Sequence, residues 1–142
     1  MENNCYTWPW KPMDTIPVDN ELNTLLKLNP EFPLAISHDD LSTYKNGFVN
    51  WHKQSSVEIS IVTEGTIIVN LLNHQETISA GEGYLLFPGV LHHISNGTQK
   101  NPARCETLFF EPHLLTGFRG SYFESPIINP KSSAKIPFCT FP

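Results

Sequence analysis

Short segments in which apolar and polar residues alternate fill the middle of this 142-residue sequence. They cover residues 33–38, 45–51, 57–63, 66–72, 75–79, 84–87, 91–95 and 104–111. The segments follow one another at intervals of roughly 8–12 residues, and turn-forming residues stand between most of them. Short strands at this spacing are typical of an antiparallel sandwich or a closed barrel, so we predict an all-β fold.

The two ends of the chain have different patterns. Residues 1–17 hold two tryptophans and three prolines, which indicates an irregular arm. Four leucines between residues 18 and 29 lie near helical spacing, and Asp19 or Asn20 could cap them, so we predict a short helix there. Residues 112–117 fit one helical turn, and the Pro- and Ser-rich tail fits a loop. We therefore divide the chain into an arm with a helix (1–32), a barrel (33–116) and a C-terminal extension (117–142).

Composition narrows the class of protein. The chain has 9 Lys and Arg residues against 14 Asp and Glu residues, a net charge of -5, which argues against direct nucleic-acid binding. No apolar run approaches the roughly 20 residues of a membrane span, and no signal-peptide pattern begins the sequence. The three cysteines are odd in number and widely spaced, which is typical of reduced thiols. We expect a cytoplasmic protein without a membrane partner.

Four polar residues carry the candidate chemistry. His52 and Gln54 are two residues apart, so they share one face of a strand, and Glu58 lies at an even distance from each. His92 comes from a different hairpin. In a barrel, we expect these four side chains to meet at one mouth.

The spacing around these residues resembles the two motifs of the cupin superfamily. The first motif, G-x5-H-x-H-x3,4-E-x6-G, is matched by His52, Gln54, Glu58 and Gly65, with Gly47 one residue short of the expected position. The second motif, G-x5-P-x-G-x2-H-x3-N, is matched by Gly81, Gly89, His92 and Asn96, with Phe87 in place of the proline. The resemblance implies a jelly-roll, double-stranded β-barrel with irregular arms at both ends.

The resemblance also implies a metal site. In metal-binding cupins, the residues at the positions of His52, Gln54, Glu58 and His92 hold a divalent ion such as zinc, nickel or iron. Gln54 departs from the pattern, because an amide oxygen is a weaker ligand than imidazole for these metals. The alternative is a hydrogen-bonded polar cluster without a metal, since a buried carboxylate needs polar partners.

Further segments resemble the sensor domains of bacterial AraC-type transcription regulators. These segments are Glu58–Gly65, Gly83–His92 and Leu108–Leu115. The resemblance implies a domain that is not an enzyme and that binds a small polar effector, such as a sugar, inside the barrel. The ligand-binding residues we expect are Trp51, His52, Gln54, Glu58, Ser60, Tyr84 and His92.

The resemblance sets the expected partners as well. Such regulators read DNA through a C-terminal pair of helix-turn-helix motifs, and we expect this chain to lack that domain. DNA would then be an indirect partner, and a homodimer is a further expectation. The competing interpretation is a stand-alone metal-dependent enzyme, a dioxygenase or an isomerase, which needs a tightly bound metal with an open coordination position.

Overall fold

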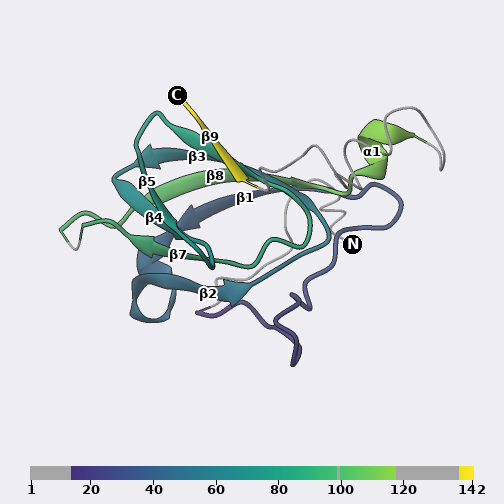
Figure 1. Cartoon of the computed structure of the whole chain (residues 1–142), viewed down its shortest axis with the longest axis horizontal. Coiled ribbons are helices and arrows are strands. Elements are labelled where there is room, and N and C mark those ends of the chain that lie inside the picture. The colour runs from purple at the N-terminus through teal and green to yellow at the C-terminus, as the bar shows by residue number, and fades with distance from the viewer. Residues whose placement is uncertain (1–13, 99, 118–137) are drawn as a thin grey trace, which may run out of the picture.

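The computed structural model describes residues 14–98, 100–117 and 138–142, and nearly all of its regular structure is strand (Figure 1). The strands are β1 (Leu34–Asp40), β2 (Phe48–His52), β3 (Val57–Glu64), β4 (Thr66–Asn70), β5 (Gln75–Ser79), β6 (Gly83–Leu86), β7 (His92–Asn96), β8 (Arg104–Phe110) and β9 (Phe138–Phe141). The helical elements are two short 3-10 turns, η1 (Leu41–Thr43) and η2 (Lys45–Gly47), and one α-helical turn, α1 (His113–Thr116).

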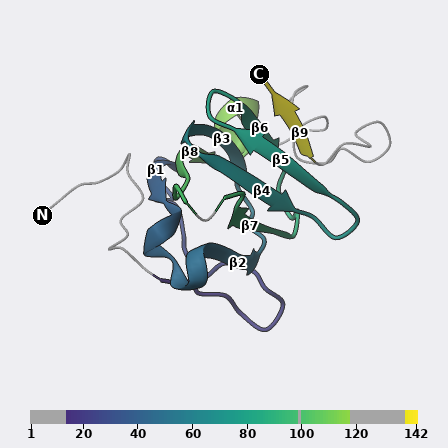
Figure 2. The same ribbon diagram turned by 90° about the vertical axis from the view of Figure 1, so that its left-hand side faces the viewer.

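The strands form two antiparallel sheets that face each other (Figure 2). One sheet has five strands in the order β1-β8-β3-β6-β9, and the other has four in the order β2-β7-β4-β5. Consecutive strands repeatedly fall in different sheets, as in a jelly roll. The prediction of an all-β jelly-roll barrel is therefore confirmed.

Strand alternation builds the core between the sheets. On β3, Val62 is fully buried while its neighbour Ile61 is 46% exposed, so even-numbered residues of this strand point inward. On β4, Ile67 and Val69 point inward from the opposite sheet and are fully buried. The inward direction of Glu58 and Ser60 follows from the same alternation.

The short helix predicted between residues 18 and 29 is wrong. Val18 instead forms a β-bridge with Thr24. The carboxylate of Asp19 accepts the backbone N–H groups of Glu21 and Asn23 at 2.8 and 2.9 Å, and Leu22 takes a positive φ of 67°. Local side-chain hydrogen bonds of this kind compete with helix formation, which explains the failure of the leucine pattern.

The prediction that the whole C-terminal extension is loop is also wrong. Strand β9 pairs with β6, from Gly83 opposite Phe141 to Leu86 opposite Phe138, and Phe138 is buried in the core. Edge pairing of a four-residue strand depends on a distant partner, so no local pattern indicates it. The proposed arm at 1–13 and the tail at 118–137 lie outside the described residues, and the domain boundaries stay a prediction.

Candidate ligand pocket and metal site

Two histidines from neighbouring strands begin the site. His52 ends β2 and His92 begins β7, and the two residues are paired in register with ring centroids 4.3 Å apart. Residues three apart on a regular strand point to opposite faces. A β-bulge between Val49 and His52 turns the side chains of Val49 and His52 to the same, inner face. The sequence thus places two imidazoles side by side at one end of the four-stranded sheet.

The carboxylate of Glu58 faces these histidines from the five-stranded sheet. Tyr84 donates its hydroxyl to Oε1 at 2.6 Å, and Gln54 donates its amide to Oε2 at 2.8 Å. The same Oε2 lies 3.3 Å from Nε2 of His92. The structure therefore brings together all four residues of the expected metal site, and the ligand atoms of His52, Glu58 and His92 lie within 4.8 Å of one another.

The outer nitrogens of the histidines fix their tautomers. Nδ1 of His52 lies 2.8 Å from the carbonyl oxygen of Asn50, and Nδ1 of His92 lies 2.9 Å from that of Val90. A carbonyl only accepts, so each Nδ1 carries a proton, and in a neutral ring each Nε2 has a lone pair. Imidazoles that bind metals in proteins are oriented in this way.

Nε2 of His92 has no hydrogen-bond partner among the described residues, although it is completely buried. A lone pair 3.3 Å from a carboxylate oxygen is unfavourable unless a proton or a metal ion lies between the two atoms. Two imidazole nitrogens and a carboxylate oxygen are a donor set suited to zinc, nickel or iron. The residues present therefore fit a divalent metal, and Gln54 could add an amide oxygen if its side chain turned.

Electrostatics keep Glu58 and His52 in their metal-binding forms at neutral pH. Burial alone would raise the pKa of Glu58, but His92, Tyr84 and His52 outweigh burial and lower that pKa to about 2. Burial and the neighbouring His92 lower the pKa of His52 to about 4. Glu58 is thus ionised and His52 is neutral.

A cavity adjoins the cluster. The volume open to water inside it is about 40 Å³, and one water molecule requires roughly 10–15 Å³ on the same measure. Its lining residues are Ile16, Thr24, Leu26, Asp39, Leu41, Tyr44, Val49, His52, Gln54, Glu58, Tyr84, Ile94, Cys105, Thr107 and Phe109. The cavity has room for a few waters, and a larger ligand requires one of its walls to move.

The segment before β1 closes one side of the cavity. It contributes Ile16, Thr24 and Leu26 to the lining. The amide of Asn50 on β2 exchanges two hydrogen bonds with the backbone of Ile16, at 2.8 and 3.1 Å. Backbone hydrogen bonds also join Thr24 to Lys53 at 2.9 Å, so the segment is tied to the barrel on both sides of its lining residues.

Some of the expected ligand-binding residues line the cavity and others do not. His52, Gln54, Glu58 and Tyr84 line the cavity, and His92 lies beside it against Glu58. Ser60 is fully buried and bonded to Thr107 at 2.8 Å, outside the lining. Trp51 is not brought to the cavity, because it alternates with His52 and packs on the ring of His93 at 5.4 Å.

Sequence analysis missed several lining residues. Asp39 and Tyr44 lie at the other end of the cavity from the histidines, and Thr107 lies between the two ends. The alternation of Ala35, Ser37 and Asp39 with exposed neighbours on β1 is the signal that could have located Asp39.

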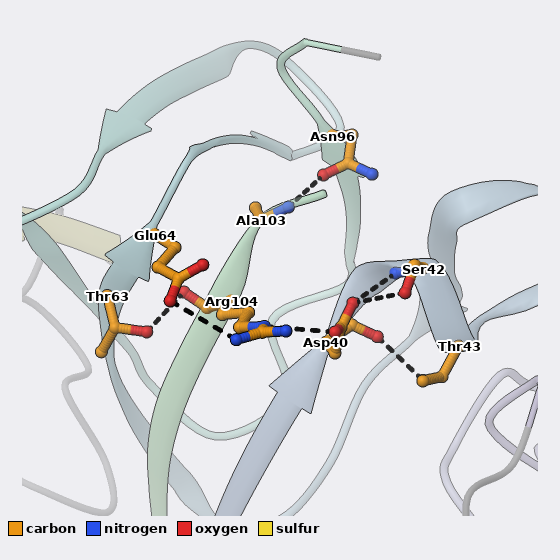
Figure 3. A network of polar contacts seen from close by, with 8 residues as sticks. All are labelled: Asp40, Ser42, Thr43, Thr63, Glu64, Asn96, Ala103 and Arg104. Atoms are coloured by element: carbon orange, nitrogen blue, oxygen red, sulfur yellow. Dashed lines mark hydrogen bonds and ion pairs between the residues drawn. The ribbon is translucent and has the colours of Figure 1, made fainter. Parts of the chain in front are cut away.

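A separate polar network lies beyond that end of the barrel (Figure 3). Arg104 reaches Asp40 at 3.2 Å and Glu64 at 3.4 Å, which ties β8 to β1 and β3. Asn96 accepts the backbone N–H of Ala103 at 2.8 Å and so holds the connection between β7 and β8. The motif asparagine thus has a structural role here, and the exposed ion pairs contribute little stability.

Facing antiparallel sheets that enclose a His–Glu–His cluster and a cavity define a cupin-type ligand-binding barrel. The family described as AraC-like ligand binding domain matches residues 40–138. The chain belongs to this family, because the match spans more than half of its length. Within the described residues, no helix is long and apolar enough to cross a membrane.

Solved structures with a similar fold include a cupin-2 domain containing protein from Shewanella frigidimarina, with 22% identity and a TM-score of 0.41. A mutant oxalate decarboxylase from Bacillus subtilis has 16% identity and a TM-score of 0.48. The similarity covers 53% of this chain and 66% of the Shewanella chain, and 56% of this chain and 21% of the decarboxylase. Structural similarity at these identities and TM-scores does not indicate a function for this chain. No curated protein sequence matches the chain.

Proposed function

We propose that this domain senses a small polar effector, such as a sugar, in the cavity between its two sheets. It acts as the regulatory half of an AraC-type transcription regulator and is not an enzyme. Effector binding controls how a DNA-binding domain is presented, and DNA is therefore an indirect partner. The effector shifts the equilibrium only if it binds one arrangement of the domain better than another.

The composition of the cavity wall is the observation that carries this proposal. Ile16, Leu26, Val49 and Ile94 supply apolar surface, while Gln54, Glu58 and Tyr84 supply polar groups. Sites for small polar ligands combine such apolar walls with a few fixed polar groups. The carboxylate of Glu58 is held by two short hydrogen bonds, so it is oriented before a ligand arrives.

A metal ion belongs to this proposal as a resident group. His52, Glu58 and His92 would hold it, with Gln54 next to them. Such an ion would offer a Lewis-acidic point to a hydroxyl or carbonyl oxygen of the effector. It would also give a partner to the buried Nε2 of His92, which has no hydrogen bond among the described residues.

A thermal-unfolding screen against sugars, with and without zinc, tests the proposal. A ligand that binds only the folded chain at about 100 times its Kd stabilises it by about 2.7 kcal/mol, which gives a rise in Tm of several degrees. Glu58→Gln should reduce that rise, whereas Glu64→Gln, on an exposed position of the same strand, should not. Equal responses from the wild type and Glu58→Gln would place the effector elsewhere.

The second candidate function is a stand-alone metal-dependent dioxygenase or isomerase. The observation that favours it is the His52, Glu58 and His92 triad, because three protein ligands leave open positions on a metal. Oxygen consumption and sugar isomerisation by the zinc-, nickel- and iron-loaded chain test this candidate. Turnover that disappears in His92→Ala would favour the enzyme, and binding without turnover would favour the sensor.

A further inference from the structure

Polar side chains form a ladder along the inner face of the five-stranded sheet. The register of β1, β8, β3 and β6 places inward-facing residues in successive rows across the sheet. The first row holds Ala35, Phe109, Glu58 and Leu86, the second holds Ser37, Thr107, Ser60 and Tyr84, and the third holds Asp39, Cys105 and Val62. The opposite sheet is mainly apolar here, through Val49 and Ile94. The polar residues of these rows that line the cavity are Glu58, Thr107, Tyr84 and Asp39, so this wall offers a hydrogen-bonding group in each row.

Two tyrosine–carboxylate pairs mark the two ends of this ladder. At one end, Tyr84 donates to Glu58 at 2.6 Å, and at the other, Tyr44 donates to Asp39 at 2.9 Å. Four residues of β8 separate the two rows, which is about 13 Å along the strand.

In the metal-free domain, the carboxylates of Glu58 and Asp39 give the cavity a negative character. None of its described lining residues is a lysine or arginine. Burial raises the pKa of Asp39 despite the hydrogen bond from Tyr44, which indicates that its carboxylate is poorly compensated. A ligand that donates a hydrogen bond to this carboxylate would supply the missing stabilisation, whereas an anion would add repulsion in a poorly solvated space.

We propose that Asp39, positioned by Tyr44, is a second anchor for the effector, and that the effector is a donor-rich molecule without an anionic group. A neutral polyol or an amino sugar fits this requirement, and a sugar acid or a sugar phosphate does not. The inference rests on the proposed sensing function and specifies the ligand class of the same cavity. In this arrangement Asp39 binds one end of the ligand and Glu58 binds the other, and together they determine which ligands are accepted.

Matched ligands test the inference. Calorimetric titrations of the chelator-treated whole chain use pentoses and hexoses, each beside its aldonic acid and its 1-amino-1-deoxy alditol, all in one buffer that contains the chelator. The neutral sugar or the amine should bind, and the acid should bind at least about tenfold more weakly. Asp39→Asn keeps an acceptor for Tyr44, and it should weaken the favoured ligand and reduce its advantage over the acid.

Glu106→Gln is the matched control. Glu106 follows Cys105, the residue of β8 that pairs with Asp39, but its side chain is exposed on the outer face of the sheet. The substitution therefore removes a nearby negative charge that does not face the cavity. It should leave the affinities and their ratio unchanged. Tyr44→Phe should weaken the favoured ligand in the same direction as Asp39→Asn, and thermal unfolding checks that each variant is folded. Equal binding of acid and sugar, or an unchanged ratio in Asp39→Asn, would overturn the inference and leave the sensing function intact. Failure of the whole panel to bind the wild type would instead count against the proposed function.

Discussion

The hydroxyl of Tyr84 lies 2.6 Å from Oε1 of Glu58, and both side chains are almost completely buried. They face each other from paired strands, two residues apart in the register of β3 and β6. The bond holds a buried carboxylate in one orientation and helps to keep its pKa low. The site therefore depends on the pairing of β3 with β6 as much as on its own residues.

Tyr84→Phe should destabilise the domain by about 1.5–3 kcal/mol, because it removes a buried hydrogen bond to a charged acceptor. Urea unfolding at neutral pH measures this loss. A double-mutant cycle with Glu58→Gln separates the interaction from the cost of each change. A coupling energy near zero would contradict the role assigned to this bond.

Acid should destabilise the metal-free domain from about pH 6.5 downward. The pKa of His52 is about 4 in the folded chain and near 6.5 when unfolded, so the unfolded state takes up more protons between these values and stability falls with pH. The shift corresponds to a loss on the order of 3 kcal/mol, complete below pH 4. Glu58 has a folded pKa of about 2, so its contribution is present above pH 4.5 and is lost toward pH 2.

Urea unfolding of chelator-treated protein at intervals from pH 7.5 to 4.5 measures this dependence. His52→Gln should flatten the curve, while His74→Gln, at an exposed position, should not. A wild-type stability that is constant over this range would show that His52 does not titrate as its burial requires.

Much of the fold could be predicted because strand alternation is a local signal. The inward direction of Glu58, Ser60 and Val62 follows from it directly. The helix predicted at residues 18–29 failed where the side chain of Asp19 offered the backbone a turn. Strand β9 was missed because its partner β6 lies more than fifty residues away in the sequence.

The site was predictable to a similar extent. Spacing and resemblance located His52, Gln54, Glu58 and His92. Trp51 does not line the cavity, because alternation puts it on the opposite face of β2 from His52, and the bulge in β2 turns His52 inward. Asp39 and Tyr44 required the register of β1 with β8 and the turns that follow β1.

Gly83→Ala should prevent the native pairing of β3, β6 and β9. An added Cβ would lie 2.5 Å from the ring of Phe141 and 2.5 Å from the carbonyl oxygen of Ser60, and backbone cannot move away as a side chain can. We expect a loss of several kcal/mol, and Phe141→Ala should not rescue it, because the Ser60 carbonyl remains.

Gly81→Ala is the comparison, since Gly81 has a φ of +93° but open space around the added Cβ. Its cost should be about 1 kcal/mol, from backbone conformation alone. Denaturant midpoints of the two variants measure the difference. Similar costs for the two substitutions would contradict the close approach of β9 to β6.

Gln54→His should raise the affinity of the domain for zinc by roughly tenfold or more, because it adds an imidazole to the candidate ligands. Gln54 already contacts Glu58 at 2.8 Å, so an imidazole there lies next to the other three candidate ligands. Nitrogen donors bind zinc more strongly than an amide oxygen does. Competition with a chromogenic chelator measures the affinity, and His92→Ala in the same background should abolish the gain. His74→Ala, which removes an exposed imidazole, is the control and should change nothing. An affinity that does not respond to Gln54→His would favour the alternative of a hydrogen-bonded polar cluster that binds no metal.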